Sequence, residues 1–347
     1  MGQGPPLPAA TSDYPLGERA GAAFLWQYPA LAMVTTLEDC LPANLRGPST
    51  RITPIADGLS GARVYAVEAE GRSFVLKIAT PDEDTADWAR AVHLQRLAAE
   101  AGIAPTVVHV DEARRAFVSA FVVDQSFLRH YLDPSTHEAA LTELGQLIRR
   151  IHALPVPASA VAIDRRQVLR QVWAELRTDC ALPDFVGAAI ERVLAEAPPP
   201  SDRAQVLGHN DVNPSNIVYD GEAILMLDWA VAGPADPFYD LAAISVFLRM
   251  DEDTCLRLLS AYDGKTATAI PARLSYTRRL VAAFAGTVQL CIARRLNHPG
   301  ASGTETLAAT LSFAEFVEKL LAGEVKFGTP DGQWAFGLAL LKESLEL

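Results

Sequence analysis

Basic residues are scarce relative to acidic ones in this chain of 347 residues. Lysine and arginine number 30 against 42 aspartates and glutamates, which gives a formal net charge of −12. A surface that binds nucleic acid needs clustered lysines and arginines to neutralise phosphates, so we expect no nucleic-acid partner. The negative field instead favours a cationic small molecule near a cleft, or it serves only to keep the protein soluble.

Cysteine is also sparse. The four cysteines are far apart in the chain and form no Cys-x-x-Cys pair; they are Cys40, Cys180, Cys255 and Cys291. This spacing indicates neither a zinc site nor a disulfide framework. A reducing, cytoplasmic compartment is therefore the simplest expectation.

Long hydrophobic runs are missing as well. The most apolar segment, residues 280–293, is too short to cross a bilayer, so we interpret it as a buried helix and expect no membrane partner. Residues 20–34 have the apolar content of a signal peptide. However, Gln27 and Pro29 interrupt the run and Glu18 lies where a basic residue is required, so we predict no signal peptide.

The chain has enough apolar material for two lobes, since it is longer than one hydrophobic core usually supports and is 50% hydrophobic. Residues 1–35 are rich in proline, glycine and alanine and are expected to form an arm. Residues 36–123 have the alternation of strands and one helical segment, whereas residues 124–347 have mostly helical periodicity. The predicted class is α+β, with a small lobe of five antiparallel strands and one helix followed by a larger helical lobe.

The periodicity also places the individual elements. Strands are expected within residues 53–57, 64–69, 73–78, 107–110 and 116–121, and the helix of the small lobe over residues 85–101. Helices of the large lobe are expected at residues 137–154, 166–178, 184–196, 241–250, 253–262, 272–296, 304–321 and 330–345.

Two features of the strand region suit a bound phosphate. Residues 59–63, LSGAR, form the tip of the first hairpin, where a glycine lets backbone N–H groups approach an anion, although a plain surface turn is the alternative. Lys77 lies within an apolar strand, where a charge is costly without a partner such as a phosphate. On an edge strand it would point to solvent instead.

Residues 206–240 contain the densest set of chemically useful side chains. Asp211 and Asn216 share a loop, and the apolar run at 224–227 leads directly into Asp228, which predicts a carboxylate at the mouth of a buried strand. Asp-x-x-x-x-Asn followed by a strand-terminal Asp is the pattern with which kinases hold a substrate hydroxyl and two magnesium ions. Turn capping is the alternative for an isolated Asp or Asn.

These motifs, in this order, resemble the aminoglycoside phosphotransferase and choline kinase family of the protein-kinase-like superfamily. The resemblance covers roughly residues 50–325 and rests on HNDVNPSN at 209–216, LDW at 227–229, GPADPFYDLA at 233–242 and IRRIHAL at 148–154. It implies a bilobal kinase-like fold that uses ATP and Mg²⁺.

The resemblance also implies roles for single residues. Asp211 would accept the proton of the acceptor hydroxyl or orient it, while Asn216 and Asp228 would hold magnesium and Lys77 would contact the α- and β-phosphates. The remaining nucleotide contacts would come from two segments. Leu59, Ser60, Gly61, Ala62 and Arg63 would cover the triphosphate, and Phe121, Val122 and Val123 would lie near the hinge that receives adenine.

Other residues of this stretch are expected to be structural. We expect His209 to bond loop backbone, and Asp236 and Asp240 to hold the following helix and loop in place. Only seven residues separate Asp228 from Asp236, which leaves no room for the long activation segment of a protein kinase. A small-molecule acceptor is therefore favoured.

One departure from the kinase pattern concerns the partner of Lys77. Kinases pair this lysine with a glutamate on the following helix, but the middle of that helix here has no acidic residue. Asp87 and Glu83 are the nearby candidates.

The sequence thus predicts an ATP- and Mg²⁺-dependent phosphotransferase for an aminoglycoside-like, choline-like or thiamine-like alcohol, with a cationic acceptor favoured. The alternative is a weak or inactive nucleotide-binding pseudokinase that acts through a partner. The acceptor pocket is expected after residue 241, where the candidate acidic contacts are Asp251, Glu252, Asp253 and Glu305.

Overall fold

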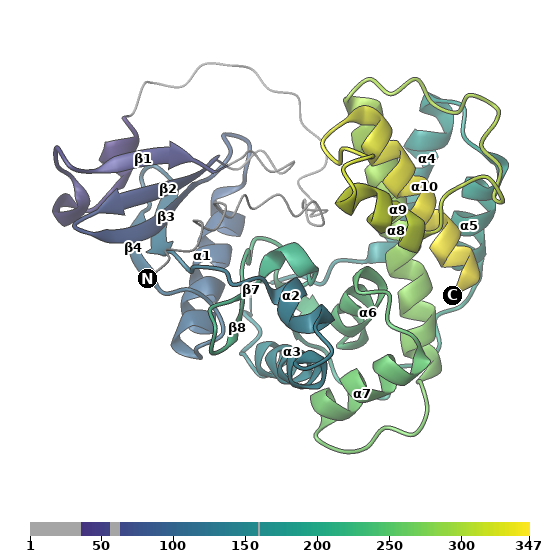
Figure 1. Cartoon of the computed structure of the whole chain (residues 1–347), viewed down its shortest axis with the longest axis horizontal. Helices are drawn as coiled ribbons and strands as arrows, with labels where there is room; N and C mark the ends of the chain where they lie inside the picture. The colour runs from purple at the N-terminus through teal and green to yellow at the C-terminus, as the bar shows by residue number, and fades with distance from the viewer. Residues whose placement is uncertain (1–35, 56–62, 159) are drawn as a thin grey trace, which may run out of the picture.

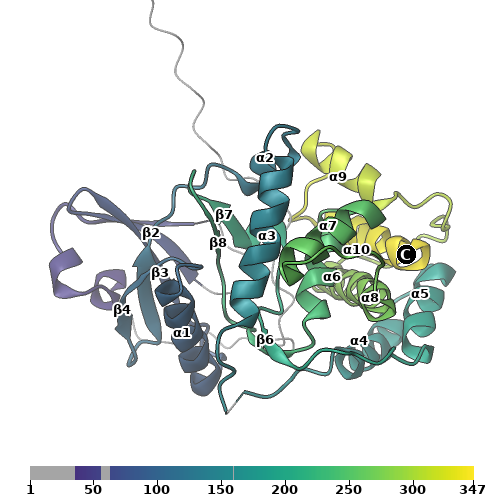
Figure 2. The ribbon, with the colours of Figure 1, turned by 90° about the horizontal axis from the view of Figure 1, so that it is seen from below.

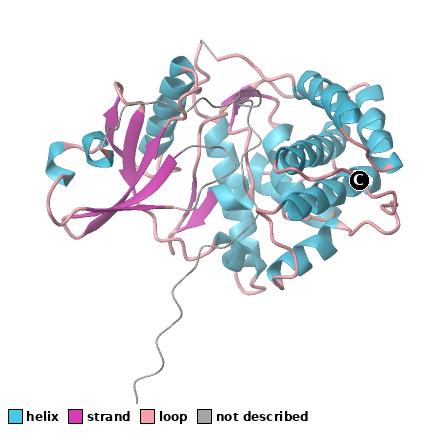
Figure 3. Ribbon diagram, turned by 90° about the horizontal axis from the view of Figure 1, so that it is seen from above, coloured by secondary structure: helices cyan, strands magenta, loops and turns pink. Residues whose placement is uncertain are grey.

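The computed structural model describes residues 36–55, 63–158 and 160–347, which form two unequal lobes (Figure 1). The strands of the large sheet gather in the small lobe at the left of Figure 1, and most of the helices lie in the large lobe at the right. Figure 3, coloured by secondary structure, shows the same division from above. The predicted α+β class with a five-stranded antiparallel sheet is confirmed.

The small-lobe sheet has the strand order β1-β2-β3-β5-β4, and all its neighbouring strands are antiparallel. Along β3 the residues alternate between the two faces, as expected for a half-buried strand. Leu76 and its buried neighbours pack towards two short 3₁₀ helices, Leu37–Cys40 and Ala43–Leu45. The strands are β1 (Arg51–Pro54), β2 (Arg63–Ala69), β3 (Arg72–Ile78), β4 (Val107–Asp111) and β5 (Ala116–Ala120).

Lys77 lies on the opposite face of the same sheet. Its cross-strand neighbour on β5 is Phe117, which packs with Trp88 and Val92 of helix α1 (Thr85–Glu100). Cross-strand neighbours point to the same face, so the Lys77 side chain projects on the face that α1 covers. This face turns towards the large lobe in Figure 2.

Helix α1 also connects the two lobes. The Asp84 carboxylate caps its first turn, and near its end Leu94 and Ala98 belong to the main core of the large lobe. After the helix, the carbonyl of Ile103 accepts a hydrogen bond from the Met226 N–H at 2.8 Å. The end of α1 is thus fixed to the strand that leads into Asp228. Because α1 contacts both lobes, the predicted lobe boundary at residue 123 stays a prediction.

The large lobe is built around the long helix α8, with α10, α6, α4 and α5 packed against it. Figure 2 shows α3 standing between the small lobe and the other helices. The helices are α2 (Phe127–Leu132), α3 (His137–His152), α4 (Arg165–Asp179), α5 (Asp184–Ala195), α6 (Phe238–Phe247), α7 (Glu252–Asp263), α8 (Ala272–Arg295), α9 (Phe313–Leu321) and α10 (Pro330–Glu346).

Glycine allows the close contact of α8 and α10. A Cβ atom at Gly286 would lie 2.8 Å from the carbonyl oxygen of Gly337, a separation that real side chains do not tolerate. The two backbones therefore approach each other at a point where neither residue has a side chain.

Two short antiparallel pairs of strands position the loops of residues 206–240. Strand β6 (Val206–Gly208) pairs with β9 (Gly233–Ala235), and β7 (Ile217–Tyr219) pairs with β8 (Ile224–Met226). The loop that carries Asp211 leaves β6, and the loop that carries Asp228 leaves β8.

The structure corrects several predicted elements. The helix expected from residue 304 begins at Phe313, because Ser312 and Glu315 form a reciprocal capping box there. Helix α6 begins at Phe238, where the Asp236 carboxylate accepts the backbone N–H of Phe238 at 2.9 Å. Helix α2 was not predicted, since six residues are too few to show a clear period. None of the helices within the described ranges is long and apolar enough to cross a membrane.

Candidate functional site

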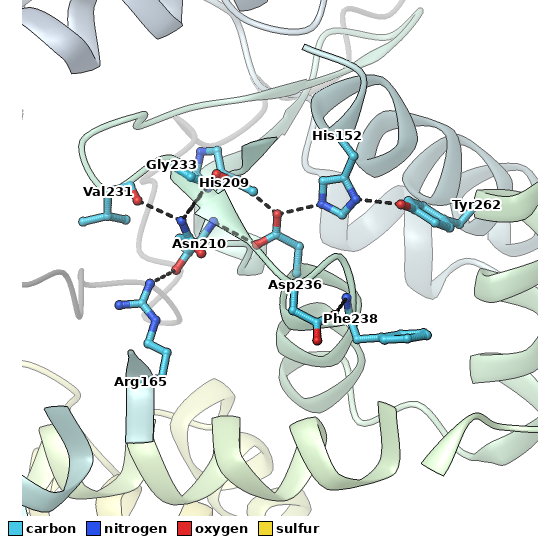
Figure 4. Close-up of polar contacts among 11 residues, drawn as sticks. His152, Arg165, His209, Asn210, Val231, Gly233, Asp236, Phe238 and Tyr262 are labelled. Atoms are coloured by element: carbon cyan, nitrogen blue, oxygen red, sulfur yellow. Dashed lines mark hydrogen bonds and ion pairs between the residues drawn. The ribbon is translucent and has the colours of Figure 1, made fainter. Parts of the chain in front are cut away.

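The loop after β6 turns sharply at Asn210, whose φ of 66° lies in the left-handed region. Asparagine tolerates this conformation better than most residues, because its short side chain can bond nearby backbone. Its Nδ2 donates to the carbonyls of Val231 at 3.1 Å and Gly233 at 3.3 Å (Figure 4). The turn is therefore held to the start of β9, and it directs the next residue, Asp211, away from the line of β6.

The Asp240 side chain holds the same turn by bonding its backbone. Its buried carboxylate accepts the backbone N–H groups of His209 at 2.7 Å and Asn210 at 2.8 Å, and also His152 Nε2 at 3.0 Å. Burial alone would raise the pKa of Asp240, but these hydrogen bonds and the neighbouring histidines lower it below its ordinary value. Figure 4 shows His152 reaching on to Tyr262, whose hydroxyl lies 2.8 Å from Nδ1.

His209 fixes the loop to the segment before Asp228. Its Nε2 donates to the carbonyl of Leu227 at 2.9 Å, and its ring meets Trp229 edge-on at a centroid distance of 5.0 Å. Burial lowers the pKa of His209 below its ordinary value, which keeps the ring neutral. The histidine bonds backbone, as the sequence predicted.

Asp211 and Asn216 meet across the loop. Asp211 Oδ2 accepts from Asn216 Nδ2 at 2.7 Å, and Oδ1 accepts from Asn213 Nδ2 at 3.1 Å. Because the Asn216 amide uses its N–H₂ group on Asp211, its carbonyl oxygen remains the side-chain atom suited to a cation. The structure therefore brings two of the three predicted site residues of this stretch into direct contact.

The third predicted site residue, Asp228, follows β8 in a left-handed conformation, with φ 62°. The Leu227 N–H donates to the carbonyl of Asn216 at 2.7 Å, so the two loops lie side by side. Lys77 Nζ donates to Asp228 Oδ1 at 2.8 Å, although the two residues are 151 positions apart. The side chains of this pair are 19% and 4% exposed, so the ion pair is largely shielded from solvent.

Neither acidic candidate for pairing with Lys77 makes that contact among the described residues. Asp87 pairs with Arg90, one turn further along α1, and its side chain is 58% exposed. Glu83 precedes the helix, where its carbonyl accepts from the Arg115 guanidinium. Among the described residues, the carboxylate paired with Lys77 is that of Asp228, and this pair joins the sheet of the small lobe to the loops of the large one.

The other predicted nucleotide contacts lie in two places. Leu59, Ser60, Gly61 and Ala62 lie outside the described residues, and Arg63 begins β2 opposite Ile78. Phe121, Val122 and Val123 follow β5 as the segment that leads into the large lobe. The next two residues anchor this segment, since Asp124 Oδ1 accepts the Tyr219 N–H at 2.9 Å and the Gln125 N–H donates to the Tyr219 carbonyl at 2.7 Å.

A pocket opens beside Asp211 on the side of the large lobe. Its cavity volume is about 30 Å³, and it opens to solvent. Apart from Asn210 and Asp211, its lining is apolar or aromatic: Val212, Tyr239, Ala243, Phe247, Val281, Phe284 and Ala285. The pocket is therefore suited to an apolar molecule that presents a polar group to Asp211.

The four acidic residues proposed for the acceptor are used elsewhere. Asp251 caps α7 by accepting the Thr254 N–H at 2.8 Å, and Glu252 and Asp253 occupy the first turn of that helix. Glu305 accepts the backbone N–H of Ser302 at 3.0 Å. They are not among the described residues that line the pocket, and their contact with an acceptor stays a prediction.

Sequence reasoning missed His152, Tyr262 and Arg165. His152 could have been found as the polar residue of the apolar repeat of its helix, whereas Arg165 gave no signal, because it lies in an arginine-rich run of ordinary appearance. Its side chain is 7% exposed, and its Nη2 donates to the Asn210 carbonyl at a long 3.4 Å (Figure 4).

Comparison with known proteins identifies the family of the chain. The model of the phosphotransferase enzyme family matches residues 51–274. Among curated proteins, mouse acyl-CoA dehydrogenase family member 10 is 29% identical over 119 residues, which is 32% of this chain. The chain spans only about a tenth of that protein's length, since the match covers 11% of it.

Several solved structures share the fold. A choline/ethanolamine kinase family protein from Mesorhizobium loti superposes with a TM-score of 0.55 at 21% identity, covering 87% of this chain and 94% of that one. Choline kinase from Cryptosporidium parvum gives 0.56 at 12% identity, over 73% and 86% of the two chains. An aminoglycoside-3'-phosphotransferase of type VIII gives 0.50 at 25% identity, over 69% and 94%. With its family model matched over more than half its length, the chain belongs to the phosphotransferase enzyme family.

Proposed function

We propose that this protein transfers the γ-phosphoryl group of ATP to the hydroxyl of a small molecule, with Mg²⁺ as the cofactor. The observation that carries the proposal is the position of Asp211. Its carboxylate lines the pocket of the large lobe and bonds Asn216, and the loop of Asn216 runs beside that of Asp228. An acceptor in the pocket and a nucleotide beneath the small-lobe sheet would thus meet at one loop.

The donor set at this loop fits magnesium. Asp228 offers a carboxylate and Asn216 an amide oxygen, and Mg²⁺ in phosphoryl transfer takes one or two such protein ligands and fills its other positions with phosphate oxygens and water. The bound ion would neutralise charge that develops on the phosphoryl oxygens. Lys77, which already lies 2.8 Å from Asp228, is positioned to exchange that contact for a phosphate.

In the proposed reaction, the acceptor hydroxyl oxygen forms a bond to the γ-phosphorus while the bond from that phosphorus to the bridging oxygen of ADP breaks. The hydroxyl proton passes to the Asp211 carboxylate, or Asp211 only orients the hydroxyl until the proton leaves with the product. Asn213 and Asn216 hold the carboxylate by its two oxygens, so it faces the pocket in a fixed orientation.

A direct test is incubation with ATP, Mg²⁺ and a panel of small alcohols, read out as ADP release and as the mass of a phosphorylated acceptor. Acceptor-dependent ADP release is expected. Silence across a broad panel, despite Mg²⁺-dependent ATP binding, would count against transfer.

A nucleotide-binding pseudokinase is the alternative, and it was motivated by the missing helix glutamate. The Lys77–Asp228 pair weakens this argument, because Asp228 gives the lysine a carboxylate partner in the absence of a helix glutamate. Thermal stabilisation by ATP that does not depend on Mg²⁺ would favour the pseudokinase.

A further inference from the structure

A buried cation packs against two aromatic rings that line the proposed acceptor pocket. Arg165, the first residue of α4, is only 7% exposed, and its guanidinium lies 4.9 Å from the Tyr239 ring centroid and 5.6 Å from that of Phe284. Both rings line the pocket, as does Asn210, whose carbonyl accepts the arginine's hydrogen bond. The charge is therefore next to the space that the proposed acceptor would occupy.

Several other partly buried arginines of the lobe are paired with carboxylates. Arg203 pairs with Asp263 through two hydrogen bonds, Arg273 pairs with Asp236, and Arg279 pairs with Glu196. No Asp or Glu in the described ranges lies within 4.0 Å of the Arg165 guanidinium. Two aromatic rings and one long hydrogen bond offset only part of the cost of burying this charge.

A carboxylate or phosphate on a bound acceptor would supply the missing counter-charge. The same positive charge would oppose a cationic acceptor, despite the overall charge of −12. The apolar lining formed by Phe247, Val281 and Ala285 suits the hydrocarbon portion of such a molecule.

We infer that the acceptor is an anionic alcohol with an apolar chain, an inference that rests on the proposed function. Its hydroxyl meets Asp211, its hydrocarbon portion lies on the aromatic wall, and its anionic end is recognised by Arg165. The global acidity of the protein then says nothing about the charge of the substrate.

Matched sets of alcohols test the charge. Each set holds one hydrocarbon chain constant and varies its far end among a carboxylate, a phosphate monoester, a neutral amide and an ammonium group, and kcat/KM is measured for each. We expect an anionic member to exceed its amide by about 10- to 100-fold, as a charge-assisted hydrogen bond supplies, and the ammonium member to be poorest. The carboxylate and phosphate arms decide which anion is used.

Variants of Arg165 test whether the arginine recognises the anionic end of the acceptor or only supports the loop at Asn210. In Arg165→Ala the preference for the anionic member should collapse through a rise in its KM, while Arg165→Lys should keep part of it. Arg170→Gln is the matched control, because it removes the same charge from an exposed position of α4 and should keep the preference. Equal loss of kcat for all members in Arg165→Ala would indicate a purely structural arginine and overturn the inference.

One measurement needs no variant. A saturated acid that matches the best acceptor but lacks the hydroxyl should compete with that acceptor, whereas its amide should not. Turnover of neutral or cationic alcohols without any preference for anions would overturn the inference and leave the proposed function standing. If no alcohol of any charge is phosphorylated while Mg²⁺-ATP still binds, the proposed function fails and the inference fails with it.

Discussion

The two sides of the Asp211 loop balance their charges in different ways. On the side of the small lobe, Lys77 and Asp228 neutralise each other at 2.8 Å across the space where the nucleotide is proposed to bind. On the side of the large lobe, Arg165 is held over Tyr239 and Phe284 with no carboxylate of the described residues beside it. On the first side, a bound nucleotide has to separate the Lys77–Asp228 ion pair. On the second side, a bound acceptor can supply a negative charge to Arg165. Variants that affect one side alone can therefore separate binding of nucleotide from binding of acceptor.

Asp211→Asn should have the largest effect and should separate the two sides most clearly. Without the carboxylate, the acceptor hydroxyl loses its proton acceptor or its orienting group, so we expect kcat to fall by about 10³- to 10⁴-fold, the upper part of what a positioned acid or base contributes. Mg²⁺-dependent ATP binding, followed by thermal shift, should stay. The exposed Asp202→Asn serves as the control. Full activity in Asp211→Asn would end the assignment.

Asp240→Ala should disturb the nucleotide side and the acceptor side together, because this carboxylate holds the Asp211 loop that lies between them. The change leaves two backbone N–H groups and His152 without their buried acceptor, and we expect it to lower the free energy of unfolding by about 3–5 kcal/mol. Chemical denaturation measures it, with Asp202→Ala as the exposed control. A loss below about 1 kcal/mol would contradict the role given to Asp240.

These two carboxylates illustrate what the sequence could reveal. Asp211, Asn216 and Asp228 belong to one short stretch with kinase spacing, so their proximity was predicted from order alone. The pocket beside Asp211 is lined by side chains of α6 and α8, an arginine of α4 packs against two of them, and no local spacing relates those helices. The sheet and most helices were predictable because burial imposes a period on their residues, whereas α2 was too short and the start of α9 depends on a cap.

The Lys77–Asp228 pair should behave as a coupled unit on the small-lobe side. Lys77→Met leaves a carboxylate that is 4% exposed without its lysine, so we expect a loss of about 1–3 kcal/mol in the free energy of unfolding. Asp228→Asn should abolish the Mg²⁺ dependence of ATP binding.

A double-mutant cycle checks the coupling. The combined Lys77→Met and Asp228→Asn variant should be more stable than the sum of the two single losses predicts, since no buried charge is then left behind. Strict additivity would show that the two side chains act independently in solution.

His209 should make stability depend on pH. Its pKa is lowered in the folded protein, so between that pKa and the ordinary value of about 6.5 the unfolded chain binds more protons than the folded one. The contribution of His209 is therefore complete above about pH 6.5 and is lost as the pH falls, by at most about 1.4 kcal/mol per pH unit. His209→Gln, which can still donate to the Leu227 carbonyl, should flatten the stability profile between about pH 7 and 5. An unchanged slope would mean that the ring protonates without cost.

The smallest effect is expected for Asp87→Asn, and it tests whether the lysine of the small lobe needs a helix partner. Asp87 forms an exposed pair with Arg90, and such surface pairs contribute about 0–0.5 kcal/mol, so neither stability nor ATP affinity should change appreciably. Glu83→Gln is the matched control from the same segment. A tenfold weaker ATP affinity in Asp87→Asn alone would mean that α1 moves when nucleotide binds and brings Asp87 to Lys77. In that case the Lys77–Asp228 pair would form only in the ligand-free protein. The difference in charge balance between the two sides of the loop would then disappear when nucleotide binds.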